Sequence, residues 1–242
     1  MFGDTQPAAS RDTPREVIRK RVLVIAPHAD DAELGCGGYI ARTTQSGGSV
    51  IVWVGAVGDI VHFFSGKRVT ADERMAESNA ALGILGVKDV RFGFVGFDSK
   101  MDQVPIGDGV RQLDALMEEV KPHEVFLPLP SYHQDHQVVH RMAVAATRPN
   151  PAKHQPTLIA AYEYPASSWG EGSSADEARG GLYVDISDTI DLKCASLQQH
   201  KSQMGNDQHI FSITAARALA AIRGIESAFT FAELFYVMRL RM

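Results

Sequence analysis

Hydrophobic positions along the chain follow two alternating patterns. Short continuous apolar runs rich in β-branched residues are typical of strands buried on both faces of a parallel sheet. Between these runs lie longer segments whose apolar residues recur every three or four positions, as in amphipathic helices. We predict strands over residues 22–26, 50–54, 90–94, 125–127, 158–164 and 182–186. We predict helices over residues 37–45, 71–85, 110–120, 135–147, 189–202 and 212–223.

The order of these elements indicates the fold. Strands that alternate with helices form βαβ units, whose right-handed crossovers build a parallel sheet. The pattern therefore predicts an α/β fold, a Rossmann-like three-layer αβα sandwich with a mainly parallel sheet. Such folds carry their sites at the carboxyl ends of the strands. Residues 21–242 show no internal repeat or clear boundary, so we predict one domain there, preceded by an N-terminal arm over residues 1–20.

Two segments fall outside the alternation of strands and helices. Residues 167–181 are rich in glycine and serine and form a candidate lid over a site. Residues 229–240 are apolar and aromatic, and we predict that they lie in the core or at a subunit interface.

The composition restricts the class of protein. The 242 residues are 45% hydrophobic and 22% charged, which is typical of a soluble globular protein. The net charge of -5 argues against a nucleic-acid-binding protein that relies on a basic surface. The 2 cysteines are too few for a disulfide framework or a thiolate zinc cluster, and they fit a reducing compartment. Because the sequence shows neither a signal peptide nor an apolar run of about 18 residues, we expect a cytoplasmic protein without a membrane span.

Histidines and aspartates gather after two of the predicted strands. Residues 27–31 follow the first strand and read Pro-His-Ala-Asp-Asp, and residues 131–136 follow the fourth and read Ser-Tyr-His-Gln-Asp-His. Because the carboxyl ends of parallel strands lie at one edge of the sheet, these side chains are predicted to converge. Catalytic zinc takes three protein ligands and keeps one position for water. His28, one of the two aspartates, and His133 or His136 would suffice.

The remaining groups of this cluster suit the hydrolysis of a carbonyl compound. Zinc lowers the pKa of bound water to about 7, and the aspartate that does not bind the metal would accept the proton as water attacks. A second histidine on the opposite wall would stabilise the oxyanion or protonate the leaving amine.

A further pair of histidines does not support a metalloprotease. His136 and His140 have the four-residue spacing of that zinc pair, but the chemistry needs a glutamate base where Gln137 stands. We therefore predict that His140 lies outside the ligand set.

The two motifs carry a resemblance to a known family. Residues 27–38 read Pro-His-Ala-Asp-Asp-Ala-Glu-Leu-Gly-Cys-Gly-Gly, and residues 133–136 read His-Gln-Asp-His. The sequence resembles the PIG-L/LmbE-like zinc-dependent N-acetylglucosamine deacetylases. Their motifs are a Pro/Ala-His-Pro-Asp-Asp-Glu segment followed by a glycine pair, and a His-x-Asp-His segment. Weaker likenesses extend to residues 200–203 and 231–233. The resemblance implies the LmbE-like form of the αβα fold.

The resemblance also implies a set of metal ligands. Zinc would be held by His28, Asp31 and His136, although histidine and carboxylate ligands suit ferrous iron as well. Two departures from the family pattern are Ala29, in place of a proline, and Ala32, in place of an acidic residue. Neither departure changes an implied ligand.

Catalytic and substrate-binding residues follow from the same resemblance. Asp30 would be the general base that acts on the attacking water. His133 would polarise the tetrahedral intermediate or act as an acid, and Asp135 would orient His133. Arg74 and Asp98 are candidates for substrate contact, although Arg74 could instead pair with an acidic residue one turn along its helix.

Together these inferences predict a hydrolase that removes the acetyl group from an N-acetylated amino sugar or its conjugate. Two alternatives remain open. A metallo-phosphoesterase would commonly need two metals about 3.5–4 Å apart and more carboxylates. A non-catalytic sugar-binding protein would keep the fold without turnover. The family resemblance and the apolar residues 229–240 favour a homo-oligomer.

Overall fold

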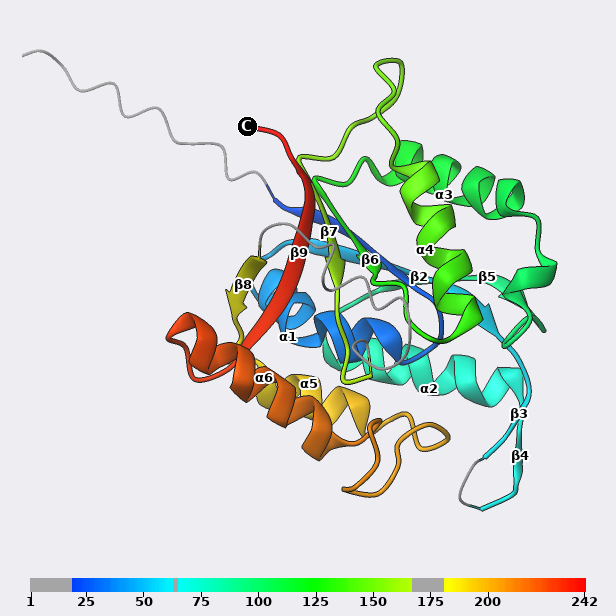
Figure 1. Ribbon diagram of the computed structural model, residues 1–242, viewed down its shortest axis with the longest axis vertical. Helices are drawn as coiled ribbons and strands as arrows, with labels where there is room; N and C mark the ends of the chain where they lie inside the picture. Colours follow the sequence, from blue (N-terminus) through cyan, green and yellow to red (C-terminus); the bar gives the residue numbers. More distant parts are fainter. Residues whose placement is uncertain (1–18, 63–64, 167–180) are drawn as a thin grey trace, which may run out of the picture.

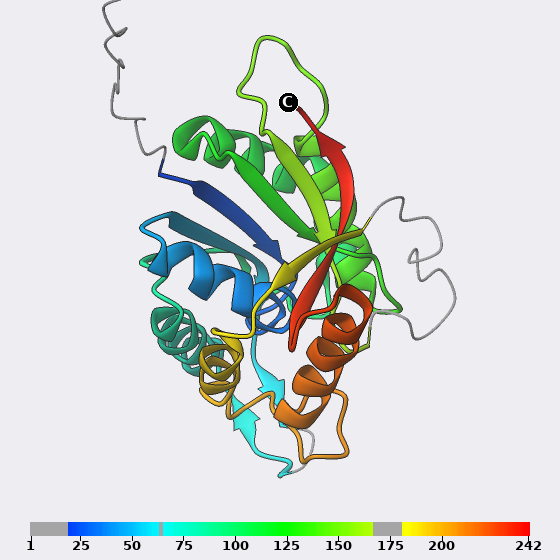
Figure 2. The same cartoon turned by 90° about the vertical axis from the view of Figure 1, so that its left-hand side faces the viewer.

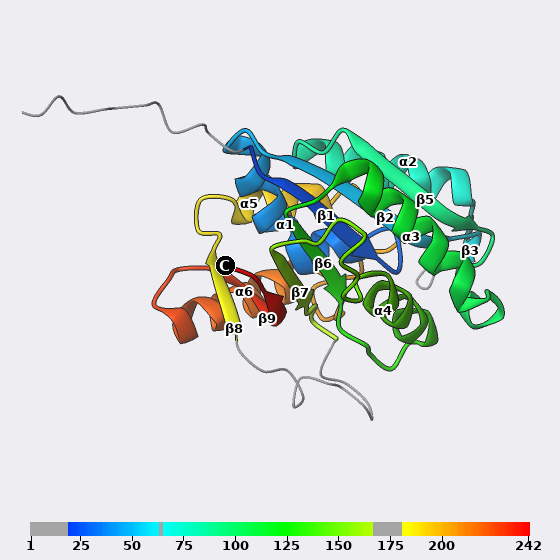
Figure 3. The same ribbon diagram turned by 90° about the horizontal axis from the view of Figure 1, so that it is seen from above.

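A mixed sheet of seven strands forms the centre of the molecule (Figure 1). The computed structural model describes residues 19–62, 65–166 and 181–242. The strands are ordered β5-β2-β1-β6-β7-β9-β8, and seen from above they follow one another from β5 at one edge to β8 at the other (Figure 3). Their bounds are β1 (Arg21–Ala26), β2 (Ser49–Val57), β5 (Asp89–Val95), β6 (Glu124–Pro128), β7 (Leu158–Tyr162), β8 (Gly181–Asp185) and β9 (Ala232–Leu240).

Helices cover both faces of this sheet. They are α1 (Asp31–Gln45), α2 (Ala71–Ile84), α3 (Ile106–Val120), α4 (Gln134–Ala146), α5 (Ile190–Leu197) and α6 (Ile213–Ser227). A short 3-10 helix η1 (Met101–Gln103) and a hairpin of β3 (Ile60–Val61) and β4 (Arg68–Val69) complete the described elements. Helices α3 and α4 lie on one face, and the other four lie on the opposite face (Figure 1). Within the described residues, none of the helices is both long and apolar enough to cross a membrane.

Strand β1 shows why the apolar runs are continuous. Val22 and Val24 pack into the core beneath α1, α2, α5 and α6, whereas Leu23 and Ile25 pack into the core beneath α3 and α4. Successive strand residues point to opposite faces, so a strand covered on both sides needs apolar residues at every position. The predicted three-layer α/β fold is confirmed.

The sheet departs from a purely parallel arrangement at one edge. Strands β1, β2, β5, β6 and β7 are parallel, whereas β9 runs antiparallel to both of its neighbours, β7 and β8. Figure 2 shows β9 (red) beside β7 and β8. The sequence predicted only a core or interface role for this segment, because the buried Glu233 interrupts its apolar run. Residues 167–180 of the predicted lid and most of the arm over residues 1–20 lie outside the described residues, and Gly181 is the first residue of β8.

Helix α1 begins at Asp31, several residues before the predicted start. The prediction began too late because three glycines within the helix obscure its helical pattern in the sequence. These glycines allow neighbouring elements to approach closely. A Cβ on Gly35 would lie 2.1 Å from the ring of Tyr162, and one on Gly38 would lie 2.6 Å from Ile186. The absence of side chains at these positions therefore sets how closely α1 packs on the sheet.

We expect Gly35→Ala to destabilise the fold by about 1–3 kcal/mol, the usual cost of overpacking a core. The ring of Tyr162 has little freedom to move, because it is buried and its hydroxyl donates to the carbonyl of Ile25 at 2.9 Å. Urea unfolding followed by circular dichroism measures the effect. Gly83→Ala in α2 is the control: a Cβ at this position would meet no atom within 4 Å, so helix propensity should stabilise the variant by about 0.5–1 kcal/mol. Equal stability of the two variants would contradict the packing argument.

Candidate active site

The two histidine and aspartate motifs lie side by side at the carboxyl edge of the sheet. Strand β1 pairs in parallel with β6, so the loops that follow these strands meet. The first loop leads into α1 and the second into α4. The ends of β2 and β5 adjoin the same place, because β2 pairs in parallel with both β1 and β5. The polar residues thus converge at the carboxyl edge of the sheet, where the sequence predicted the site.

His28, Asp31 and His136 form a compact group. One nitrogen or oxygen atom from each lies within 4.8 Å of the others. Asp31 Oδ2 accepts a hydrogen bond from the His28 backbone amide at 2.9 Å, and it lies 3.4 Å from His28 Nδ1 and 3.3 Å from His136 Nε2. Two imidazoles and one carboxylate match the ligand types of a catalytic zinc site, so this group could hold a metal ion.

The electrostatics of this group favour a positive charge. Burial lowers the pKa of His28, but hydrogen bonds with Asp135 and Asp31 raise it overall to about 10. Burial raises the pKa of Asp31, yet the imidazoles of His136 and His28 hold it below its usual value. The carboxylates therefore stabilise a cation at this position, whether it is a proton or a metal ion.

Asp30 lies beside this group at the start of α1. It is buried, and it occupies the N-cap position without making a side-chain capping bond. Burial and the adjacent Asp31 raise its pKa, and the nearby charges of His200, His28 and Arg74 oppose the rise. The carboxylate is therefore not used as a helix cap, which is the usual role of aspartate at such a position.

His133 is the N-cap residue of α4. Its Nδ1 accepts a hydrogen bond from the backbone amide of Asp135 at 3.2 Å. Burial and the neighbouring His28 lower the pKa of His133, which favours the neutral imidazole. A neutral imidazole that accepts at Nδ1 carries its proton on Nε2. The geometry therefore gives His133 a second nitrogen that can donate a hydrogen bond.

The carboxylate of Asp135 contacts His28, and the hydrogen bond from Asp135 to His133 comes from its backbone amide. Asp135 Oδ2 lies 2.9 Å from His28 Nε2 and accepts from the Ser99 amide at 2.6 Å. Asp135 Oδ1 accepts from the Met101 amide at 3.0 Å. Ser99, whose amide donates to this carboxylate, has a left-handed backbone (φ 58), which is uncommon for a residue with a side chain. Sequence reasoning missed these two amides, because backbone donors leave no motif.

Arg74 and Asp98 form an ion pair across the same site. The Nη1 atom of Arg74 in α2 donates to Asp98 Oδ2 and, at 3.1 Å, to the carbonyl of Gly58. Glu77, the acidic residue one turn along the helix, instead accepts from the amide and hydroxyl of Ser202. The alternative of an ion pair along the helix is therefore not observed.

These groups line a cleft of about 140 Å³. Its walls are His28, Asp30, Asp31, Ile60, Arg74, Asp98, Tyr132, His133, His136, Tyr164, Gln203 and Phe211. Three of these residues, Tyr164, Gln203 and Phe211, come from the chain beyond α4. For Gln203 the sequence offered a signal through the weak likeness of residues 200–203 to the family. Beneath the cleft, Glu33 Oε1 and His200 Nε2 form a buried pair at 2.8 Å.

Comparisons with known proteins identify the family. A family model described as "PIG-L: GlcNAc-PI de-N-acetylase" matches residues 23–147, more than half of the chain. The chain belongs to this family. The resemblance inferred from the two motifs is thereby confirmed, and the matched segment of the PIG-L family runs from β1 to the end of α4.

Named deacetylases resemble most of the chain. A probable N-acetyl-alpha-D-glucosaminyl L-malate deacetylase 2 of Bacillus cereus is 27% identical over 194 residues, which cover 77% of this chain and 84% of that protein. A diacetylchitobiose deacetylase of Thermococcus kodakarensis is 28% identical over 224 residues (88% of this chain and 81% of that protein). These matches confirm the prediction of an N-deacetylase.

A solved structure supports the same fold. The N,N'-diacetylchitobiose deacetylase of Pyrococcus horikoshii superimposes with a TM-score of 0.71 at 23% identity, covering 91% of this chain and 84% of that chain. The predicted LmbE-like architecture therefore agrees with that of a solved deacetylase.

Proposed function

We propose that this protein hydrolyses the acetamide of an N-acetylated amino sugar, or of a conjugate of one, with the help of a bound metal ion. The observation that carries this proposal is the convergence of His28, Asp31 and His136 on one point, with Asp30 and His133 beside it in one cleft. The named relatives are deacetylases of N-acetylated sugar compounds, which supports the same reaction class.

The residues of the site fit a zinc ion. His28, Asp31 and His136 would hold it, because together they supply two nitrogen ligands and one oxygen ligand. The Nδ1 atom of His136 is buried and has no hydrogen-bond partner among the described residues. When bound, the ion supplies a Lewis acid for the carbonyl and lowers the pKa of water to about 7. Ferrous iron suits the same ligands.

Asp30 serves as the general base in this proposal. Its carboxylate lines the cleft next to the proposed ligands and is not used in capping α1. Burial and Asp31 raise its pKa, which makes it a stronger base than an ordinary aspartate. It takes the proton of the water that attacks the acetamide carbonyl, and that proton is later available for the leaving amine.

His133 stabilises the oxyanion that forms on the former carbonyl oxygen. Its Nδ1 accepts from a backbone amide, so Nε2 carries the hydrogen that is available to the reacting group. Arg74 and Asp98 then bind the sugar: both line the cleft, and together they offer donors and acceptors to hydroxyl groups. The Arg74 Nε atom is buried without a partner among the described residues.

Release of acetate and a primary amine tests the proposed function. Zinc-loaded protein would be incubated with N-acetylglucosamine, diacetylchitobiose and N-acetylglucosaminyl malate, and the amine would be quantified with an amine-reactive fluorophore. We expect turnover of at least one compound and its loss after chelation. Phosphate release from p-nitrophenyl phosphate without amine release would favour the phosphoesterase alternative. Zinc binding without either product would favour the sugar-binding alternative.

We expect Asp135→Asn to lower zinc affinity and turnover by about 10- to 100-fold, the usual effect of losing a group that orients a metal-binding histidine. Both carboxylate oxygens of Asp135 accept hydrogen bonds, so an asparagine would place its NH₂ against a donor. Zinc affinity measured by chelator competition checks the expectation. Asp114→Asn, which removes a surface carboxylate paired with Arg148, is the control. Unchanged zinc affinity in Asp135→Asn would show that this carboxylate does not orient His28.

A further inference from the structure

A buried ion pair joins three elements beside the active site. Lys193 of α5 places its Nζ atom 2.7 Å from Glu233 Oε1 of β9, and both side chains are 4% exposed. The pair lies outside the segment that matches the family model, and no step of the proposed reaction uses it.

The pair contacts the backbone of α1 from the side. Lys193 Nζ donates to the Leu34 carbonyl at 2.8 Å, and the Gly38 amide donates to Glu233 Oε1 at 2.8 Å. In a regular α-helix, the amide of Gly38 and the carbonyl of Leu34 are hydrogen-bond partners of one another. Glu233 Oε2 also accepts from the Tyr39 amide at 2.8 Å. The two charged side chains therefore engage both ends of a single helical hydrogen bond.

Stability alone does not explain this arrangement. Burying two opposite charges usually contributes less to stability than well-packed apolar residues of the same volume. A buried polar network whose members all have partners instead fixes one arrangement of the elements that it joins. The chain also keeps space for the pair, because a Cβ on Gly37 would lie 2.9 Å from Cγ of Lys193.

A chain of hydrogen bonds connects the pair to the candidate active site. The Leu34 carbonyl accepts from Lys193, and the Leu34 amide donates to the Asp30 carbonyl at 3.0 Å. We propose that Lys193 and Glu233 are a positioning pair that fixes the first turn of α1, and so determines where Asp30 and Asp31 stand in the metal site. This inference rests on the proposed function, since it assigns the pair to the same site.

The test compares zinc binding in variants of the full chain. The double variant Lys193→Met/Glu233→Gln removes both charges, so that neither is left buried alone. Gly37→Ala keeps both charges, but its Cβ would crowd the methylene groups of Lys193. Alanine has a higher helix propensity than glycine, so a loss of helix propensity would not explain an effect of this variant. We expect each variant to bind zinc at least about tenfold more weakly in chelator competition, as when groups behind metal ligands are lost. Hydrogen exchange of the Leu34, Gly38 and Tyr39 amides should accelerate, and kcat should fall while KM stays within about twofold.

A matched control separates positioning from general loss of stability. Leu113→Ala creates a cavity in the core on the opposite face of the sheet, away from α1. We expect it to lower the urea midpoint without weakening zinc binding. Zinc affinity and kcat within twofold of the wild type in both α1-directed variants would overturn the positioning role. A wild-type chain that binds no zinc would instead overturn the proposed metal site, and this inference with it.

Discussion

Asp30→Asn is expected to keep its zinc and to lose about 10²- to 10⁴-fold in turnover, the range attributed to general acid–base catalysis. Asparagine has nearly the same shape as aspartate, and Asp30 belongs neither to the ligand group nor to a side-chain cap of α1. The fold and the metal site should therefore persist. An amide cannot take a proton from water at neutral pH, so the attack on the carbonyl loses its base.

Elemental analysis and steady-state acetate release measure the two parts of this expectation on the same preparation. Asp102→Asn in η1 is the control, because it removes an exposed carboxylate from the segment between β5 and α3. We expect its zinc content and kcat to equal those of the wild type. Activity of Asp30→Asn equal to the wild type would remove Asp30 from the mechanism, and loss of its zinc would assign Asp30 to the ligand set.

His136→Ala is expected to reduce the zinc content from roughly one ion per chain to almost none, with loss of turnover. The imidazole of His136 is one of two nitrogen ligands in the group, and a single histidine with one carboxylate leaves the site short of the three protein ligands that catalytic zinc takes. His136 is also buried at the start of α4.

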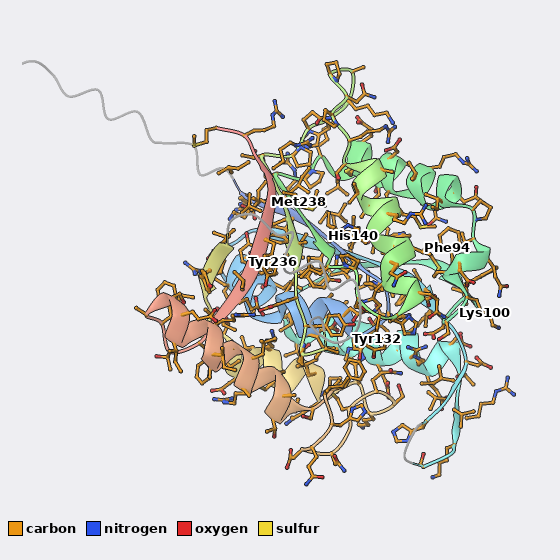
Figure 4. All side chains as sticks on the ribbon, in the orientation of Figure 1. Phe94, Lys100, Tyr132, His140, Tyr236 and Met238 are labelled. Carbon is orange, nitrogen blue, oxygen red and sulfur yellow. The ribbon has the colours of Figure 1, made fainter. Side chains whose placement is uncertain are left out.

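His140→Ala provides a matched control one turn further along the same helix. Figure 4 shows His140 on α4, away from Tyr132, which lies near the start of the helix at the cleft. The Nδ1 atom of His140 lies 2.8 Å from the carbonyl of Pro128, so its ring is engaged elsewhere. We expect this variant to retain the zinc of the wild type. Comparable metal content in both variants and the wild type would show that His136 is not a ligand.

The sequence predicted the parts of the protein that depend on local pattern. A strand covered on both faces must be apolar throughout, so β1 and β2 were visible as uninterrupted runs. The motif residues could be placed together because parallel neighbours end at the same edge of a sheet. His28 and His136 are far apart in the chain, yet their positions after β1 and β6 were sufficient to predict their meeting.

Contacts that depend on the packing of distant elements could not be predicted in this way. Glu33 and His200 are 167 residues apart, and neither residue has a periodicity or spacing that indicates the other. Asp135 was expected to orient His133, and the sequence could not show that its carboxylate also accepts hydrogen bonds from the backbone amides of Ser99 and Met101. The antiparallel β9 was missed as a strand because a buried charge occurs within it, and the partner of that charge comes from α5.

The hydrogen bonds between α1 and Glu233 of β9 join residues that are far apart in the sequence, which determines when they can form during synthesis. Gly38 and Glu233 are 195 residues apart, and β9 enters the sheet between two strands that precede it in the chain. At a synthesis rate of about 5–20 residues per second, α1 leaves the ribosome about 10–40 s before Glu233 does. During that interval the nascent helix has no carboxylate for its Gly38 and Tyr39 amides. Under the proposed positioning role, the loop that carries Asp30 and Asp31 therefore reaches its final arrangement only after Glu233 has been synthesised.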